Sequence, residues 1–331
     1  MRIPAVLAAL ALALAACAPA TVSSTTEAPA VVTTDAPVTT TTAAPDPTTT
    51  TTTEAAAFPV TVETDSGPVT INSQPNAIIS LSPTATEMLF AIGAGGQVIA
   101  VDDQSNYPPE APMTDLSGFT PNLEAILALE PDLVVISFDP GGLVEGLGAA
   151  GVPVLTLGTA ASLDDAMSQF LVLGAATGNP TQAEEVVRQI QDDLTAAVEA
   201  AAGAGEEVTY YYEISSDLYS ATSATFIGEI FGLYGMVNIA DEADPDGSAF
   251  GFPQLSSEYI VAKDPDIIFL SNTLYGESAA TVAARPGWEA MSAVQNGNIV
   301  ELDSDIASRW GPRIVEFAQA ITDALRKLSG G

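Results

Sequence analysis

Histidine is absent from the 331 residues of this chain, and only one cysteine, Cys17, is present. The first absence removes the commonest metal ligand and the commonest general base of proteins. The second excludes an intrachain disulfide. Lysine and arginine are scarce as well, eight against 42 aspartates and glutamates. The formal charge of −34 argues against nucleic acid as a partner, because its phosphates would be repelled.

A long hydrophobic run is also missing. The apolar stretch at residues 4–16 is too short for a bilayer, which needs about 20 apolar residues, but it suits a secretory signal. The sequence Leu14-Ala15-Ala16-Cys17 resembles the bacterial lipobox, in which the cysteine becomes the lipid-modified first residue of the mature chain. We therefore expect residues 1–17 to be a lipoprotein signal peptide. Lipid on Cys17 would hold the protein at the outer face of the cytoplasmic membrane. The alternative is an ordinary cleaved signal with an unrelated cysteine.

Residues 18–57 contain threonine, proline and alanine with a few acidic residues and no aromatic residue. Such a segment cannot bury enough apolar surface to offset the entropy lost on ordering. It is expected to be a disordered stalk, with or without O-glycosylation, that separates the globular part from a membrane.

From residue 58 onward, apolar strand-like runs alternate with helix-like segments. Strands are expected at residues 77–82, 98–103, 132–137, 153–158, 207–215, 266–271 and 298–304. This alternation is typical of parallel sheets covered on both faces. The pattern at 58–75 instead predicts a β-hairpin with its turn at 65–67.

One segment breaks the alternation. Apolar residues recur with helical period from Ala183 to Ala201, and Thr181 with Glu184 has the pattern of a capping box. The helix would be about 30 Å long, longer than the neighbouring helices. We therefore predict an α/β protein of two lobes with mainly parallel sheets, at 58–178 and 205–331. One long interdomain helix at 179–204 joins them, and a ligand cleft lies between them.

The stretch "SRWGPR", residues 308–313, places two of the eight basic residues beside a tryptophan. It lies between the last predicted strand and the last helix, which is expected to begin at Pro312. Open α/β sheets bind ligands at such carboxyl ends of strands. Aromatic residues of the equivalent turns either line a small-molecule cleft or seal the sheet ends. They are Tyr107, Phe119, Phe138, Tyr219, Phe250, Phe252, Tyr275 and Trp310.

An enzyme is the first competing interpretation, with Ser82, Ser271, Asp102 or Asp103 as candidate groups. No histidine base, GxSxG elbow or phosphate loop accompanies them, so no catalytic residue, resident metal or cofactor is expected. A stalked surface adhesion or structural protein is the second. It explains the anchor and the stalk but not the aromatic turns.

Four blocks of the sequence resemble the iron-chelate/cobalamin family of solute-binding proteins of bacterial ABC importers. They are "AIISLSPTATEMLFAIGAGGQVIAVDDQSNYPPEA", "PNLEAILALEPDLVVIS", "SATFIGEIFGLYGMVNIA" and "SDIASRWGPRIVEFAQAI". The resemblance covers nearly all of the globular part. It implies two lobes joined by a rigid helix, and a monomer that captures a metal chelate in the cleft and delivers it to a permease. The cobalamin-type members are the nearest, through "NYPPEA" and "SRWGPR".

Residue roles follow from the resemblance by position. Tyr107, Phe119, Phe138 and Phe252 would pack on the ligand, and Tyr219, Tyr275 and Trp310 complete the expected aromatic site. Asp305 and Arg309 would make polar contacts, whereas Arg313 would hold the sheet end or cap nearby carbonyls. Glu124 and Glu258 match the two glutamates, one in each lobe, that dock on the permease.

The chelate itself does not follow from the resemblance. A triply anionic catecholate complex would need several convergent cations, and only Arg309 is expected in the cleft. A large, mainly neutral chelate suits aromatic walls better, so cobalamin comes first and a ferric hydroxamate siderophore second. Haem is a weaker alternative because it needs a tyrosine or methionine as axial ligand.

Overall fold

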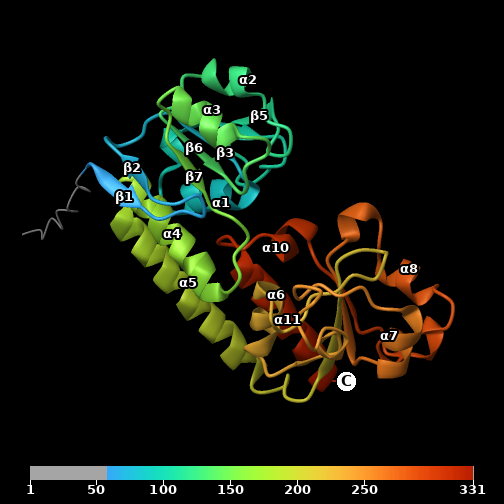
Figure 1. The fold of residues 1–331 in the computed structure, drawn as a ribbon. Helices are drawn as coiled ribbons and strands as arrows, with labels where there is room; N and C mark the ends of the chain where they lie inside the picture. The colour runs from blue at the N-terminus through green and yellow to red at the C-terminus, as the bar shows by residue number, and fades with distance from the viewer. Residues whose placement is uncertain (1–57, 331) are drawn as a thin grey trace, which may run out of the picture. The chain divides into compact units, whose positions relative to one another are not determined.

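The structure is a computed structural model that describes residues 58–330 (Figure 1). The predicted signal peptide at 1–17, the lipidation site Cys17 and the predicted stalk at 18–57 lie outside the described residues. Within the described range, no helix combines the length and the hydrophobicity needed to cross a membrane.

The first lobe begins with a hairpin and continues as strands and helices in alternation. Its elements are β1 (Val60–Val62), β2 (Val69–Ile71), β3 (Ile78–Leu81), α1 (Pro83–Ala91), β4 (Val98–Asp102), β5 (Met113–Leu116), α2 (Leu123–Leu127), β6 (Leu133–Ile136), α3 (Leu143–Ala149), β7 (Val154–Thr156) and α4 (Leu163–Thr177).

Helix α5 (Pro180–Ala201) leads to the second lobe, whose helices are mostly short. The elements of that lobe are β8 (Thr209–Glu213), α6 (Phe226–Gly232), β9 (Val237–Asn238), α7 (Ser257–Lys263), β10 (Ile267–Leu270), α8 (Ala279–Ala283), α9 (Ser292–Gln295), β11 (Ile299–Glu301), α10 (Ser304–Ser308) and α11 (Ile314–Ser329).

The two large sheets, one of five strands and one of four, have related topologies. The first has the strand order β5-β4-β3-β6-β7 and the second the order β9-β8-β10-β11. Every neighbouring pair in both sheets is parallel, whereas β1 and β2 form an antiparallel hairpin. In each sheet the chain first moves to one side of the opening strand and then crosses to the other. The carboxyl ends on either side of that reversal form the crevice where such sheets bind ligands.

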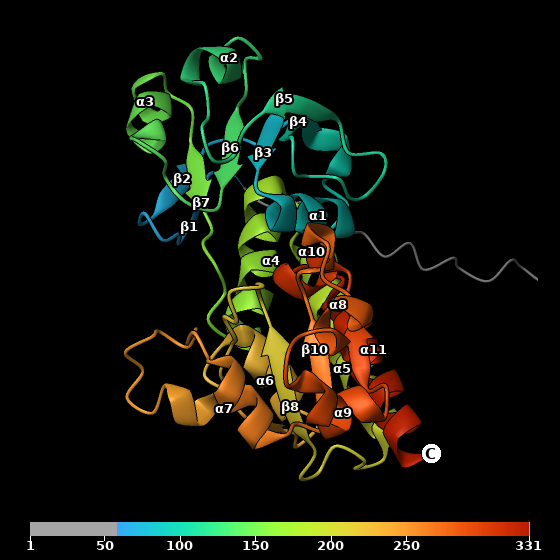
Figure 2. The same cartoon turned by 90° about the vertical axis from the view of Figure 1, so that its right-hand side faces the viewer.

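Helices α4 and α5 form an antiparallel pair that connects the lobes (Figures 1 and 2). The two helices approach closely at Gly174, where an added Cβ would collide with the Cβ of Ala183. Helix α11 packs along α5. The predicted capping box of Thr181 and Glu184 is wrong: Asn179 is the N-cap of α5 and Pro180 its first residue, so Thr181 already lies inside the helix.

One hydrophobic core runs through both lobes. It joins β-strand residues of the first lobe to α4, α5 and α11 and ends among the aromatic rings of the second lobe, such as Phe231 and Phe317. A separate cluster covers the other face of each sheet. The continuous core includes the helix pair, so α4 and α5 belong to the packing of both lobes.

The predicted hairpin and all seven predicted strands are present, so the α/β fold with two lobes and mainly parallel sheets is confirmed. Two strands, β5 and β9, and four helices, α4, α8, α9 and α10, were not predicted. The last helix begins at Ile314, two residues after Pro312. The boundaries 58–178, 179–204 and 205–331 stay a prediction.

Candidate ligand-binding cleft

A cavity of about 290 Å³, here called the polar chamber, lies between the lobes. Its first wall comes from the segments that follow β3, β4, β5 and β6, which include Asp102 and Gly118. Its second wall comes from Tyr275 and the segment 305–310. The polar chamber therefore occupies the carboxyl ends of the first sheet's strands, the position expected for a ligand site.

Two aromatic rings form a wall of the polar chamber. Phe119 and Phe138 follow β5 and β6, and their ring centroids lie 5.9 Å apart at an interplanar angle of 46°. Phe119 is 69% exposed, and Tyr275 on the opposite wall is 84% exposed. Large apolar surface that stays exposed around a cavity is typical of a binding site.

A second cavity of about 310 Å³, here called the apolar chamber, adjoins the first. Alanines and aromatic residues line most of it, among them Phe250 and Phe252. Trp310 and Ser308 border both chambers. The indole N–H of Trp310 donates to Gln169 Oε1 at 2.8 Å. This bond fixes the ring between the two chambers.

Arg309 borders the polar chamber, but protein acceptors already occupy its terminal nitrogens. Nη1 donates to Glu87 Oε1 and Asn106 Oδ1, both at 2.9 Å. Nη2 donates to the Gln104 carbonyl at 3.1 Å and to Asp305 Oδ1 at 2.7 Å. Glu87, Asn106 and Gln104 belong to the first lobe, so the guanidinium connects the lobes.

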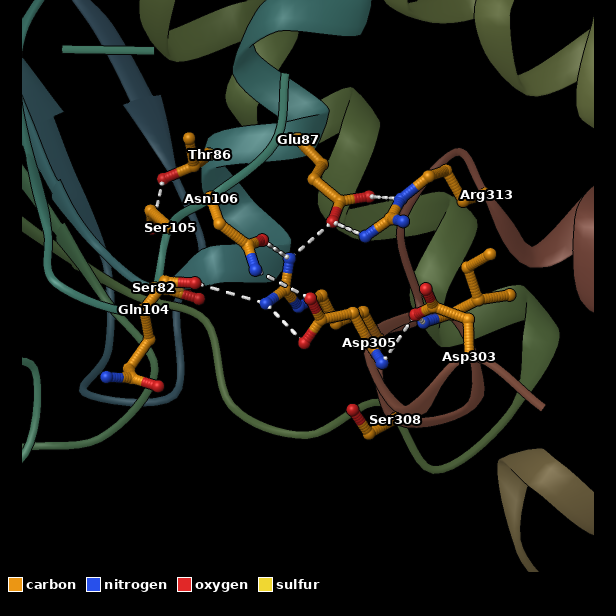
Figure 3. A network of polar contacts seen from close by, with 12 residues as sticks. Ser82, Thr86, Glu87, Gln104, Ser105, Asn106, Asp303, Asp305, Ser308 and Arg313 are labelled. Atoms are coloured by element: carbon orange, nitrogen blue, oxygen red, sulfur yellow. Dashed lines mark hydrogen bonds and ion pairs between the residues drawn. The ribbon is translucent and has the colours of Figure 1, made fainter. Parts of the chain in front are cut away.

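Glu87, on α1, is the centre of this interlobe cluster (Figure 3). Its side chain is fully buried, and it also accepts from Arg313, with Nε to Oε2 at 2.9 Å and Nη2 to Oε1 at 2.6 Å. The Arg313 guanidinium lies 4.4 Å from the ring centroid of Tyr107. The contact with Glu87 raises the pKa of Arg313, although its partial burial opposes the rise. One buried carboxylate thus holds both arginines of the "SRWGPR" stretch.

The electrostatic character of the cleft follows from these contacts. All lysines and arginines in the described part of the chain pair with a carboxylate or donate to a backbone carbonyl. Two carboxylates, Asp102 and Asp305, line the polar chamber beside the single guanidinium of Arg309. The chamber therefore offers more acceptors than free cationic donors.

The structure brings most of the predicted ligand residues to the chambers. Phe119, Phe138, Tyr275, Asp305 and Arg309 border the polar chamber, Phe252 borders the apolar one, and Trp310 borders both.

The other two predicted residues border neither chamber. Tyr107 packs under Arg313. Tyr219 is bridged to Gln254 and is partly exposed. For these two, direct contact with a ligand stays a prediction.

Sequence reasoning missed Glu87. It placed the turns 102–111 and 117–122 at the strand ends of the cleft but gave Asp102 and Gly118 no role in binding. The sequence did contain a pattern that could have identified Glu87. A glutamate between Ala85 and Met88 on an apolar helix needs a partner when that face is buried. The pattern for Asp102 is weaker: it is the last residue of a strand whose carboxyl end was expected to face the ligand. Nothing in the sequence marks Gly118.

Glu124 and Glu258 occupy equivalent positions in the two lobes. Each is the second residue of a short helix, α2 or α7, and is exposed. Asn122 and Ser256 cap these helices, each side chain accepting from the backbone N–H three residues on. The helices precede β6 and β10, which have the same place in the two sheets.

Comparison with known proteins identifies the family and agrees with the fold. Residues 78–306 match the family described as periplasmic binding protein. The uncharacterized ABC transporter substrate-binding lipoprotein YvrC of Bacillus subtilis is 30% identical over 278 residues, which cover 81% of this chain and 86% of YvrC. The cobalamin-binding protein of Halobacterium salinarum is 30% identical over 271 residues, 79% of this chain and 73% of the relative.

Comparison with a solved structure also supports this family and fold. The periplasmic vitamin B12 binding protein BtuF of Vibrio cholerae superposes with a TM-score of 0.61 at 27% identity, covering 77% of this chain and 98% of BtuF. The family match extends over well more than half of the 331 residues. The chain therefore belongs to the periplasmic binding protein family of ABC-importer substrate-binding proteins, as the four sequence blocks predicted.

Proposed function

We propose that this protein captures a cobalamin-type corrinoid outside the cytoplasmic membrane and delivers it to an ABC permease. The observation that carries the proposal is the interlobe cleft: two adjoining chambers with aromatic walls, and a guanidinium whose terminal nitrogens are already bonded.

Charge supports a neutral chelate over an anionic one. Catecholate complexes and the propionates of haem are anions that favour convergent arginines or lysines. In the polar chamber the one cation is shared between Glu87 and Asp305. The periphery of a corrinoid carries uncharged amides, which carboxylates and backbone carbonyls can bind. The names of the Halobacterium and Vibrio relatives point to the same ligand class.

In this proposal the aromatic residues hold the ring system. Phe119, Phe138 and Tyr275 would cover it in the polar chamber, and Phe252 with Trp310 would contact the part that enters the apolar chamber. Asp305 would accept a hydrogen bond from the ligand. Arg309 would act through its interlobe bonds, with Tyr107 and Tyr219 at the outer rim.

Haem remains a second candidate because of one residue. The phenol of Tyr275 borders the polar chamber and is 84% exposed, and tyrosine is one of the axial ligands that haem iron accepts. The lack of a free cation for the propionates counts against it. An uncharged ferric hydroxamate is the third candidate.

Calorimetric and absorbance titrations of the purified protein with cyanocobalamin, ferrichrome and haem test the proposal. We expect saturable binding of cyanocobalamin at one site and weaker or no binding of haem. Tighter binding of haem, accompanied by the absorbance change of tyrosinate ligation that Tyr275→Phe removes, would replace the corrinoid with haem.

We propose that Glu124 and Glu258 dock on basic residues of the permease, one from each lobe. Their equivalent exposed positions on α2 and α7 support this. Changing both to Ala should leave ligand affinity intact and lower uptake by cells. Changing Glu145 and Glu289, which are also exposed and also one per lobe, should leave uptake intact. An equal loss of affinity would place Glu124 and Glu258 in the ligand site instead.

We also propose that lipid on Cys17 anchors the protein. The YvrC relative is named a lipoprotein. Cys17→Ala should move the protein from the membrane fraction to the medium or periplasm, and an unchanged distribution would contradict the lipobox interpretation.

A further inference from the structure

The polar chamber holds a carboxyl group that forms no ion pair with a lysine or arginine of residues 58–330. Asp102 is the last residue of β4, lines the chamber and is 1% exposed. Its Oδ1 accepts from the Ser105 hydroxyl at 2.5 Å. Within residues 58–330, no side chain donates to Oδ2, and the backbone N–H of Ser105 is the one main-chain donor near this carboxyl group. A carboxylate oxygen that no side chain satisfies, on a residue that is almost fully buried and lines a chamber, points to a donor supplied by the ligand.

Gly118 keeps this oxygen uncovered. It follows β5 on the same wall of the polar chamber. A Cβ at residue 118 would stand 2.8 Å from Asp102 Oδ2 and 2.7 Å from the Leu81 carbonyl oxygen. Any other residue would therefore push against the carboxylate or displace the wall. The absence of a side chain at this point leaves room in front of Oδ2.

A chain of buried hydroxyl groups holds the orientation of the Asp102 side chain. Ser105, which donates to it, is 1% exposed, and the hydroxyl of the fully buried Thr86 lies 3.0 Å from the Ser105 hydroxyl (Figure 3). Thr86 in turn donates to Ser80 at 2.9 Å. These short, buried side chains have little freedom to rotate away. The carboxyl is thus a pre-positioned acceptor.

We propose that Asp102 determines ligand specificity by accepting a hydrogen bond from a peripheral amide of the bound chelate. This inference rests on the proposed function and names the chemistry that the cleft selects. An amide N–H satisfies the buried oxygen with a charge-assisted bond. A carboxylate at the same point of the ligand would leave two negative groups facing each other without a donor. Asp102 therefore favours amide-bearing corrinoids over acid-bearing macrocycles.

Cyanocobalamin and its monocarboxylic acids, in each of which one peripheral amide is replaced by a carboxylate, test this directly. The wild-type protein should bind one of the monoacids roughly ten- to a hundredfold more weakly than cyanocobalamin, the range for one charged hydrogen bond. Asp102→Asn should remove most of that discrimination, because its amide can donate to the ligand carboxylate. Asp115→Asn, which alters an exposed aspartate on β5, should keep the discrimination of the wild type.

Gly118→Ala gives a second variant that leaves the charges unchanged. Its methyl group should weaken cyanocobalamin binding and reduce the discrimination between monoacids. Identical monoacid profiles for the wild type and Asp102→Asn would overturn the role of Asp102 while leaving the proposed function in place. If the wild type binds ferrichrome and no corrinoid, the proposed ligand fails. Unchanged ferrichrome affinity in Asp102→Asn would then overturn this inference as well.

Discussion

Two glutamates, Glu87 in the first lobe and Glu213 in the second, are fully buried and bonded to guanidinium groups, but their surroundings differ. Glu87 accepts from two arginines that lie more than 200 residues away in the chain. Glu213 accepts from one, Arg285 of its own lobe, at 2.6 and 2.7 Å. Arg285 also pairs with Glu277 at 2.9 Å. The first cluster joins the lobes, and the second lies within one lobe.

The clusters also differ in how well their groups are satisfied. Around Glu87 the terminal nitrogens of Arg309 all have acceptors. Near Glu213, Asn272 donates to the carboxylate, yet Asn272 Oδ1 and the Tyr211 hydroxyl have no partner among residues 58–330. Burial, followed by the nearby Glu213, raises the pKa of Tyr211 well above its ordinary value. The interlobe cluster is thus the more completely hydrogen-bonded of the two, and we expect it to set how the lobes dock.

Removing Glu87 should have the largest effect. Glu87→Ala removes the carboxylate to which Arg313 donates. It leaves Asp305 as the one carboxylate bonded to Arg309. Breaking a buried pair in this way costs about 3–5 kcal/mol, and we expect the upper part of that range in urea unfolding. Hydrogen exchange should rise in both lobes near α1 and α10, because the contact between them is lost.

The control for Glu87 is Glu316→Ala, which removes an exposed glutamate from the first turn of α11. Its unfolding free energy should stay within about 0.5 kcal/mol of the wild type. If Glu87→Ala is equally mild, or if its exchange rises in the first lobe alone, the cluster does not couple the lobes.

Arg285→Met should have the next largest effect. It leaves Glu213 buried and unpaired, but Arg285 is partly exposed, so water can reach the carboxylate more easily. The loss should lie at the lower end of about 3–5 kcal/mol. Faster hydrogen exchange should be confined to β8, β10 and α8. Equal loosening of α1 would show that the two clusters are not independent.

Asp102 is a third buried carboxyl group, and it differs from Glu87 and Glu213 in its partner. A hydroxyl group donates to it, and no guanidinium does. Desolvation on burial raises the pKa of Asp102 above its ordinary value of 3.8, although the bond from Ser105 opposes the rise. The folded protein therefore binds this proton more tightly than the unfolded chain. Ionisation of Asp102 thus lowers stability as the pH rises from 3.8 through the raised pKa.

The change in stability caused by ionisation of Asp102 is the smallest of the expected effects. Asp102→Asn should melt at a slightly higher temperature than the wild type at neutral pH, and the gap should shrink as the pH falls toward 3.8. Melting curves between pH 3.5 and pH 7.5, with Asp115→Asn as the control, measure it. A gap that stays constant over this range would mean that the titration of Asp102 is not its source.

Much of the fold could be predicted, because buried parallel strands such as 133–136 are continuous apolar runs. The missed elements lack that signal. Strand β5 is a partly exposed edge strand with the sequence MTDL, and β9 has only two residues. Helix α4 begins at a good cap, Ser162, but stands outside the alternation of strand and helix because it belongs to the connection between the lobes.

The candidate site was predictable in its aromatic part and less so in its ionic part. Rings placed after strands could be assigned to the cleft because the topology brings those ends together. Ion pairing could not be assigned in the same way. The family resemblance implied separate roles for Arg309 and Arg313, whereas in the structure both donate to Glu87, more than 200 residues away. Such pairing depends on how the lobes dock, which local pattern does not encode.

The positions of the two tryptophans make the protein a built-in optical reporter. Trp288 is buried in the second lobe, where its indole donates to Ser257 at 2.7 Å. Trp310 stands between the two chambers. A coloured chelate in the cleft would quench the emission of Trp310 by energy transfer, because this indole borders both chambers. In Trp310→Phe, Trp288 is the one remaining tryptophan, so the change that is left on binding measures its share of the quenching. Stopped-flow fluorescence could thus time capture and release on the unlabelled protein.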